Sequence, residues 1–205
     1  MAKPPASESV VCPWAASEPE RSYHDAEWGV ASFDDAHLFE MLCLEGAQAG
    51  LSWRTILVKR EAYRKAFFGW DIERCARIST SHVERLLHVP DGPDAIVRHR
   101  GKIESVRDNA RAARDVIARE GSLSAYLWGL AGGAPVQNAW ENIKQVPART
   151  ETSEAMSKAL TKAGFRFVGS TTCYAFMQAV GMLNDHLVSC PRHAACAKLA
   201  KERGR

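Results

Sequence analysis

The sequence has no uninterrupted apolar run of the roughly 18 residues that a membrane-spanning helix needs. Its first ten residues, MAKPPASESV, also lack the apolar centre of a secretory signal. We therefore expect a cytoplasmic protein with no membrane partner. In that compartment the six cysteines, at positions 12, 43, 75, 173, 190 and 196, are expected to be thiols or metal ligands rather than a disulfide framework.

The chain is also poor in net charge and in strand patterns. A net charge of +3 over 205 residues does not by itself indicate a polyanionic partner, although local basic stretches can still bind one. Strand-like alternation, internal repeats and low-complexity tracts are all missing from the sequence. Its 46% of hydrophobic residues can fill one compact core. We place this domain at 11–195, between a flexible tail at 1–10 and a basic tail at 196–205.

Helical periodicity is what the sequence does have. Within 102–118, apolar residues recur at intervals of three and four and define one buried stripe. The breakers VPDGPD and GGAP are typical of connections between helices. We predict an all-α fold with helices at 35–49, 53–68, 79–88, 102–118, 122–130, 154–163 and 170–183.

The segment SYHDAEWGV, at 22–30, places many functional groups in nine positions. Its polar and aromatic side chains would point in several directions from either a helix or a strand, so neither period explains the cluster. We therefore predict a loop that delivers side chains to a functional site.

A glutamate interrupts the apolar face of the predicted helix at 35–49. Glu45 lies on the same face as Leu38 and Leu42, and an ionised carboxylate buried there needs a cation, hydrogen-bond donors or a ligand. The alternative is a boundary residue that bends to solvent or pairs with an arginine. Trp53 follows the break at Gly50 and brings an aromatic ring close to this carboxylate.

The stretch 157–181 predicts a helix, a tight hairpin and a second helix. Gly164 suits a left-handed end of the first helix, and Gly169 opens the second. Backbone N–H groups at the start of the second helix could then approach a phosphate of a nucleic acid. An ordinary helical hairpin would contain the same two glycines.

A basic stretch, RHRGK at 98–102, offers further phosphate contacts. Its candidates are Arg98, Arg100 and Lys102, and three more arginines follow on one helical face, at 107, 111 and 114. A solvated helix face is the alternative.

Cysteine and histidine recur near both ends of the chain. His186 and Cys190 lie four positions apart, one helical turn, so both could reach one ion. A tetrahedral zinc site that clips the termini together could therefore be built from Cys12, His24, His186 and Cys190. A core histidine with inert buried cysteines is the alternative, and His193 and Cys196 could substitute as ligands.

The chain carries, in this order, the motifs SYHDAEWGV, LFEMLCLEGAQAGLSW, IVRHRGKIESVRDNARA, SKALTKAGFRFVGSTTCYAFMQAVG and NDHLVSC. Over roughly residues 12–190 they resemble the motifs of bacterial 3-methyladenine DNA glycosylase I, a helix-hairpin-helix glycosylase. Several long motifs in register are far more specific than any one of them.

The resemblance implies a monofunctional hydrolase that excises 3-methyladenine from double-stranded alkylated DNA, without a lyase step or an organic cofactor. It implies that Glu45, Tyr23 and Trp53 bind the flipped base, with Glu45 as the catalytic residue, acting by recognition. It also implies one structural zinc ion per chain, held by Cys12, His24, His186 and Cys190. We expect a monomer. A zinc-stabilised DNA-binding protein that has lost excision is the alternative, and Asp185 and Trp28 are left without an assigned role.

Leu51 follows the break at Gly50, beside the expected pocket. It could fill the gap that a flipped base leaves in the duplex, and a buried core leucine is the alternative. Two features depart from the family pattern. Glu20 lies where the family often has another aromatic, and the spacing from Cys12 to His24 is one residue shorter.

Overall fold

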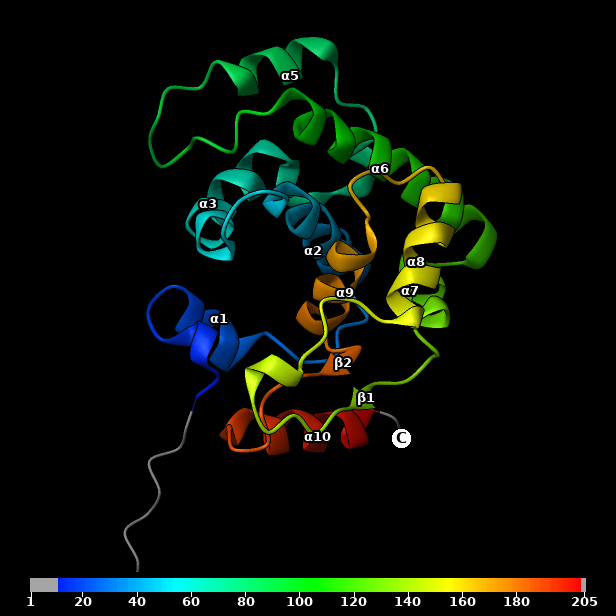
Figure 1. Cartoon of the computed structure of the whole chain (residues 1–205). Coiled ribbons are helices and arrows are strands. Elements are labelled where there is room, and N and C mark those ends of the chain that lie inside the picture. Colours follow the sequence, from blue (N-terminus) through cyan, green and yellow to red (C-terminus); the bar gives the residue numbers. More distant parts are fainter. Residues whose placement is uncertain (1–10, 204–205) are drawn as a thin grey trace, which may run out of the picture.

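The computed structural model describes residues 11–203, so the tail expected at 1–10 lies outside the described residues. The described chain is mostly helical, which confirms the predicted class (Figure 1). In chain order its elements are η1 (Pro13–Ala15), α1 (Glu20–Ala26), α2 (Asp35–Gln48), α3 (Trp53–Ala66), η2 (Phe68–Trp70), α4 (Ile72–Cys75), α5 (Thr80–Leu87), α6 (Arg100–Glu120), α7 (Leu123–Leu130), β1 (Val136–Gln137), η3 (Ile143–Gln145), α8 (Glu151–Lys162), α9 (Ser170–Ala179), β2 (Leu183–Asn184) and α10 (Pro191–Arg203).

The seven predicted helices are confirmed, with ends that differ by a few residues. The largest difference is at the end of α9, which stops at Ala179 rather than at 183. Gly181 adopts φ +71°, and Leu183 and Asn184 then pair as a parallel strand with Val136 and Gln137. Two-residue strands are too short to show alternation, so the sequence pattern could not indicate them.

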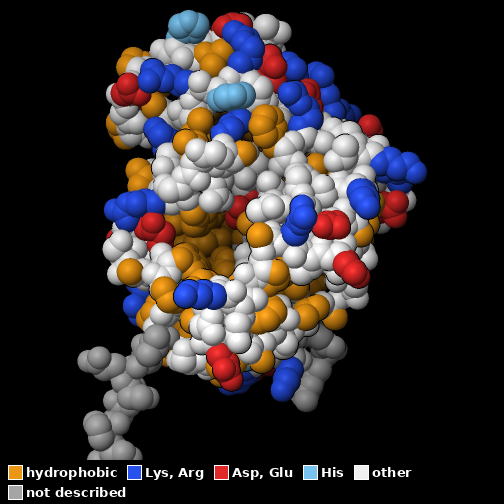
Figure 2. All heavy atoms as spheres, in the orientation of Figure 1, with side chains coloured by type: hydrophobic (Ala, Val, Ile, Leu, Met, Phe, Trp, Pro, Cys, Tyr) orange, Lys and Arg blue, Asp and Glu red, His pale blue; other side chains and the backbone are white. Residues whose placement is uncertain are grey.

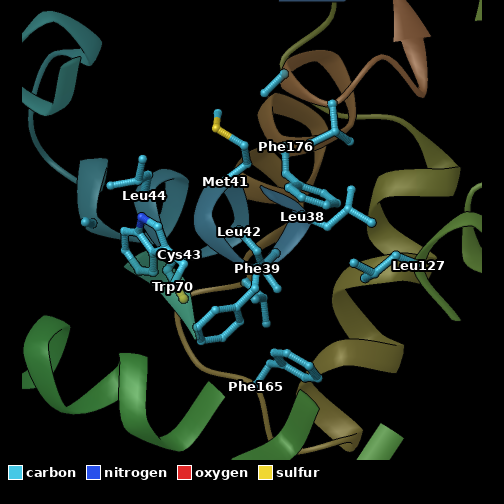
Figure 3. Packing of buried hydrophobic residues seen from close by; sticks show 14 of the residues in the cluster. Leu38, Phe39, Met41, Leu42, Cys43, Leu44, Trp70, Leu127, Phe165 and Phe176 are labelled. Atoms are coloured by element: carbon cyan, nitrogen blue, oxygen red, sulfur yellow. The ribbon is translucent and has the colours of Figure 1, made fainter. Parts of the chain in front are cut away.

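Helix α2 forms the centre of the core. Every residue from Leu38 to Ala47 is buried, and Figure 3 shows side chains leaving this helix in several directions toward Leu127, Phe165 and Phe176. The Asp34 carboxylate accepts the His37 N–H at 2.7 Å and so fixes where the helix begins. Because α2 is surrounded by protein, a polar side chain near its end must find a partner within the molecule or in a ligand.

The predicted helix, hairpin and helix are formed by α8 and α9, which pack against each other. Gly164 follows the C-cap of α8 with φ +96°, and Gly169 is the N-cap of α9. Phe165 and Val168 bury the turn between the two helices in the core. The turn is therefore fixed in place, while the glycine at the N-terminus of α9 stays exposed.

The two ends of the described chain lie at the same end of the molecule, where α10 runs beneath the short β-ladder (Figure 1). The segment after α1 is tied to the end of α9, because Gly29 and Ser32 donate their N–H groups to the carbonyls of Gln178 and Val180. Residues 196–203, expected as a basic tail, instead continue α10, and Cys196 is buried. Burial of one face of α10 explains why this stretch is a helix.

Candidate active site and metal centre

A cavity of about 420 Å³ opens between α1, α3 and α9 and extends to α2. Figure 2 shows it as a hollow with apolar side chains on its floor. The described residues that line it are mainly apolar and include no lysine or arginine: Trp14, Tyr23, Trp28, Glu45, Gln48, Trp53, Ile143, Val146, Pro147, Ala148, Thr171, Tyr174, Ala175, Gln178 and Asp185. Such a cavity suits a small, flat and largely apolar ligand.

Aromatic rings form one side of the cavity. The ring centroids of Tyr23 from α1 and Trp53 from α3 are 5.4 Å apart. Those of Trp14 and Trp28 are 4.9 Å apart. The Tyr23 hydroxyl and the Trp53 Nε1 are buried without a hydrogen-bond partner among the described residues. Buried polar groups are normally paired, so these two atoms indicate a place for a ligand. The sequence analysis predicted Tyr23 and Trp53 as site residues but did not predict Trp14. Its position two residues after the predicted metal ligand Cys12 could have indicated that it lies near the site.

Glu45 reaches the cavity from the last turns of α2. Its residue is 6% exposed, and no described residue donates a hydrogen bond to its carboxyl group. The alternative of a boundary glutamate that faces solvent or pairs with an arginine is therefore wrong. Burial raises the pKa of the Glu45 carboxyl to about 8. A ligand with donors or positive charge would relieve that cost of burial.

Asp185 also lines the cavity, but its carboxylate, unlike that of Glu45, is fully hydrogen-bonded. Its carboxylate accepts hydrogen bonds from Asn138 Nδ2 at 2.6 Å, Trp140 Nε1 at 2.8 Å, Tyr174 Oη at 2.5 Å and Gln178 Nε2 at 2.7 Å. Four donors occupy the acceptor positions of this carboxylate. Asp185 therefore joins the segment before η3 to α9 and builds the wall of the cavity.

Most of the opening cluster lies in helix α1, so the prediction of a loop there is wrong. Tyr23 faces the cavity, whereas the neighbouring His24 faces a group of cysteines and histidines; both residues are buried. The helix lies between two sites and uses two of its faces. A single amphipathic stripe is the pattern by which a helix is recognised, and a helix buried on two faces does not show it.

Cys12, His24, His186 and Cys190 come together as predicted, with ligand atoms all within 4.8 Å of one another and all four residues buried. His186 Nδ1 lies 3.1 Å from His24 Nε2 and 3.8 Å from each of the two Sγ atoms, and Cys190 Sγ lies 3.6 Å from His24 Nε2. A tetrahedral ion with bonds of about 2.0–2.3 Å has ligands about 3.3–3.8 Å apart. The cluster could therefore hold a metal ion.

The outer hydrogen bonds of the two histidines also suit a metal site. His24 Nδ1 lies 2.7 Å from the Asp25 carboxylate, and His186 Nε2 lies 3.0 Å from the Trp28 carbonyl. Each contact leaves the other ring nitrogen directed at the cluster, as metal-binding histidines require. The one-residue shorter spacing does not keep Cys12 away from the cluster.

The predicted helical turn between His186 and Cys190 is wrong, because both residues lie in the turn between β2 and α10. His193 and Cys196 do not join the cluster. His193 Nε2 lies 2.7 Å from the Asn138 carbonyl, and Cys196 Sγ lies near the Trp28 carbonyl.

The candidates for DNA contact lie in different settings. Leu51 is 40% exposed in the turn between α2 and α3, so the alternative of a buried core leucine is wrong. Arg98 and Arg100 are exposed but paired, with Asp91 and Glu84 respectively. Lys102 is half-buried and donates to two carbonyls at the end of α2. The arginines at 111 and 114 are exposed and also have partners, the Ala76 carbonyl just after α4 and Glu73 in α4 respectively.

Comparison with known proteins agrees with this arrangement. The model of the methyladenine glycosylase family matches residues 14–193. DNA-3-methyladenine glycosylase of Haemophilus influenzae is 42% identical over 181 residues, 88% of this chain and 96% of that protein. DNA-3-methyladenine glycosylase 1 of Escherichia coli is 45% identical over 181 residues, 87% of this chain and 94% of that protein. The chain belongs to the methyladenine glycosylase family.

Solved structures show the same fold. A crystal structure of a 3-methyladenine DNA glycosylase I superimposes with a TM-score of 0.84 at 44% identity, covering 89% of this chain and 98% of the other. A tyrosine-to-phenylalanine variant of such a glycosylase, crystallised in complex with 3-methyladenine, has a TM-score of 0.83 at 34% identity over 88% of this chain and 95% of the other.

Proposed function

We propose that this protein is a DNA repair hydrolase that flips 3-methyladenine out of alkylated double-stranded DNA and hydrolyses its N-glycosidic bond. The relatives are named for this base, and one related structure is in complex with it. The observation that carries the proposal is the buried, unpaired carboxyl group of Glu45, facing a cavity lined with aromatic rings.

A 3-methylated adenine in DNA is positively charged, which weakens its bond to the sugar and makes it a good leaving group. The enzyme therefore has little need of a strong general acid. Tyr23 and Trp53 would hold the cationic ring through contacts with its π face, while water attacks the sugar carbon. The lining described above has no lysine that could form a Schiff base, which supports hydrolysis without a lyase step.

Glu45 would set the choice of base. As a carboxylate it accepts a hydrogen bond from the adenine amino group, and the charge of the base favours that ionised form despite the burial. The carbonyl oxygen at the same place in 7-methylguanine would face Glu45 acceptor to acceptor. The site would therefore reject 7-methylguanine by repulsion.

The test is to incubate the purified protein with methylated duplex DNA and to quantify each released base. We expect release of 3-methyladenine with little 7-methylguanine. DNA binding without release of either base would instead identify a DNA-binding protein that has lost excision, and equal release of both bases would contradict the role given to Glu45.

We further propose that the four-residue cluster holds one structural zinc ion. Two thiolates and two imidazoles are a common structural zinc set, and the buried cluster packs against Trp14 and Trp28, the rings of which also line the cavity. The ion would tie the segment before α1 to the turn before α10 and would take no part in the reaction.

None of the helices in the described part of the chain combines the length and apolar character that a membrane crossing requires. The cytoplasmic location and the monomeric state stay predictions. Size-exclusion chromatography with light scattering would test the monomer.

A further inference from the structure

The C-terminal end of α2 is held by a lysine from another helix. Lys102 Nζ donates to the carbonyl oxygens of Ala47 at 2.9 Å and Ala49 at 2.6 Å. The last carbonyls of a helix have no donor within that helix, so the ammonium group supplies what α2 lacks. Its charge also lies at the end of α2 where a cation is favourable.

The position of Lys102 within its own helix is unfavourable. It lies in the first turn of α6, where the helix dipole disfavours a cation, and burial lowers its pKa. A lysine that reached outward to a phosphate would avoid the burial. The hydrogen bonds to the carbonyls at the end of α2 are therefore the interaction that offsets this unfavourable position of Lys102.

The chain that follows α2 forms the turn at 49–52. Gly50 adopts φ +76°, Leu51 is exposed, and the Ser52 hydroxyl caps α3 by accepting the Thr55 N–H. This turn lines a second cavity of about 210 Å³, which shares Glu45 with the aromatic cavity. Movement of the end of α2 would move both this turn and the start of α3.

The hairpin between α8 and α9 docks at the same place. A Cβ atom added to Gly46 would lie 3.0 Å from Phe167 Cβ, so only glycine lets the hairpin approach α2 this closely. The Phe167 ring also lies nearly perpendicular to that of His99, the N-cap of α6, with ring centroids 6.4 Å apart. The end of α2, the start of α6 and the hairpin thus form one junction.

We propose that Lys102 is a positioning residue, which fixes the turn at 49–52 so that Leu51 is held ready to enter the duplex when the base flips. This role replaces the phosphate contact expected from the basic stretch. It rests on the proposed excision of a flipped base.

A double-mutant cycle with Lys102→Met and Leu51→Ala tests the proposal by single-turnover excision of 3-methyladenine from duplex DNA. We expect Lys102→Met to lower the rate by up to about 10-fold, the loss expected for Leu51→Ala, because small misplacements near a reacting centre are costly. It should leave the affinity for free 3-methyladenine within about twofold of wild type. In the Leu51→Ala background the same change should cost little more, since Lys102 acts through that turn. If the rate loss of the double variant equals the product of the two single losses, the two residues act independently and the proposal is overturned.

Salt dependence separates positioning from phosphate contact. Removal of one phosphate contact lowers the slope of log affinity against log salt by about 0.9, so an unchanged slope for Lys102→Met supports positioning and a reduced slope overturns it. Lys65→Met removes a lysine charge at an exposed ion pair with Asp94 and serves as the matched control.

If Lys102→Met does not fold, Lys102→Gln, which removes the charge but keeps an N–H donor, takes its place in both measurements. A wild-type protein that releases no base would contradict the proposed function. Normal wild-type excision combined with an unaltered Lys102 variant would contradict the positioning role alone.

Discussion

The aromatic cavity and the Cys/His cluster lie on two sides of the same short helix and treat buried polar groups in opposite ways. In the cavity, Glu45 and the polar atoms of Tyr23 and Trp53 are buried without partners among the described residues. In the cluster, both histidines have a hydrogen-bond partner on the outer nitrogen and neighbouring ligand atoms on the inner one. The cavity therefore offers unpaired groups to a ligand, whereas the polar groups of the Cys/His cluster already have partners within the protein.

The difference shows what each region costs the fold. Unpaired buried groups destabilise the protein until a ligand arrives, because they have lost water without gaining a partner. A closed set of ligands stabilises the fold once an ion is present, since binding energy becomes folding energy. Changes in the cavity should therefore alter activity more than stability, and changes in the cluster should do the reverse.

The largest effect is expected from breaking the cluster. His186→Ala should remove most of about one equivalent of bound zinc, and it should lower the midpoint of thermal unfolding strongly, because loss of a structural metal is among the most destabilising changes. Metal analysis and thermal denaturation measure both. His193→Ala, at a histidine outside the cluster, is the matched control. Equal metal content in the two variants would contradict the assignment.

The next largest effect is on excision. Glu45→Gln keeps the size of the side chain but replaces an acceptor with a donor, so excision of 3-methyladenine should fall roughly 10- to 100-fold, while DNA affinity stays nearly unchanged. Glu61→Gln, on the exposed face of α3, should excise as the wild type does. Unchanged activity in Glu45→Gln would make Glu45 a structural carboxyl group.

The same substitution should have a smaller, pH-dependent effect on stability. The pKa of Glu45 is raised by burial to about 8 in the folded protein, so its neutral form favours folding at low pH, and this contribution is lost as the pH rises from about 4.5 through 8. Glu45→Gln does not titrate. Its unfolding midpoint relative to wild type should therefore rise between pH 5 and pH 9; a constant difference would contradict the raised pKa.

The smallest effect is expected at the turn beside the cavity. Leu51→Ala should lower excision from duplex DNA about 10-fold, because the gap left by the flipped base would stay unfilled. At 40% exposure its loss should change the free energy of unfolding by less than about 1 kcal/mol. Val58→Ala, at another exposed apolar residue, should change neither quantity. Normal duplex excision by Leu51→Ala would contradict the role as a wedge.

Much of the fold could be predicted because helices are encoded locally. Intervals of three and four residues gave the main helices, and Gly164 and Gly169 marked the hairpin between α8 and α9. Glu45 could be found because a charge on an apolar face is visible without a structure. Helix α1 could not, because Tyr23 and His24 serve different sites and leave no single stripe.

The sequence by itself determined the helical class, the family motifs and the types of residue that meet a base or a metal ion. Tertiary structure decided which carboxyl group is free. Asp185 is saturated by donors from residues 138, 140, 174 and 178, whereas Glu45 has none from any described residue. The tertiary structure also decided that Lys102 hydrogen-bonds to the end of α2. The physical reason is that periodicity reports neighbours within one or two helical turns, while hydrogen-bond partners and burial depend on segments far apart in the chain.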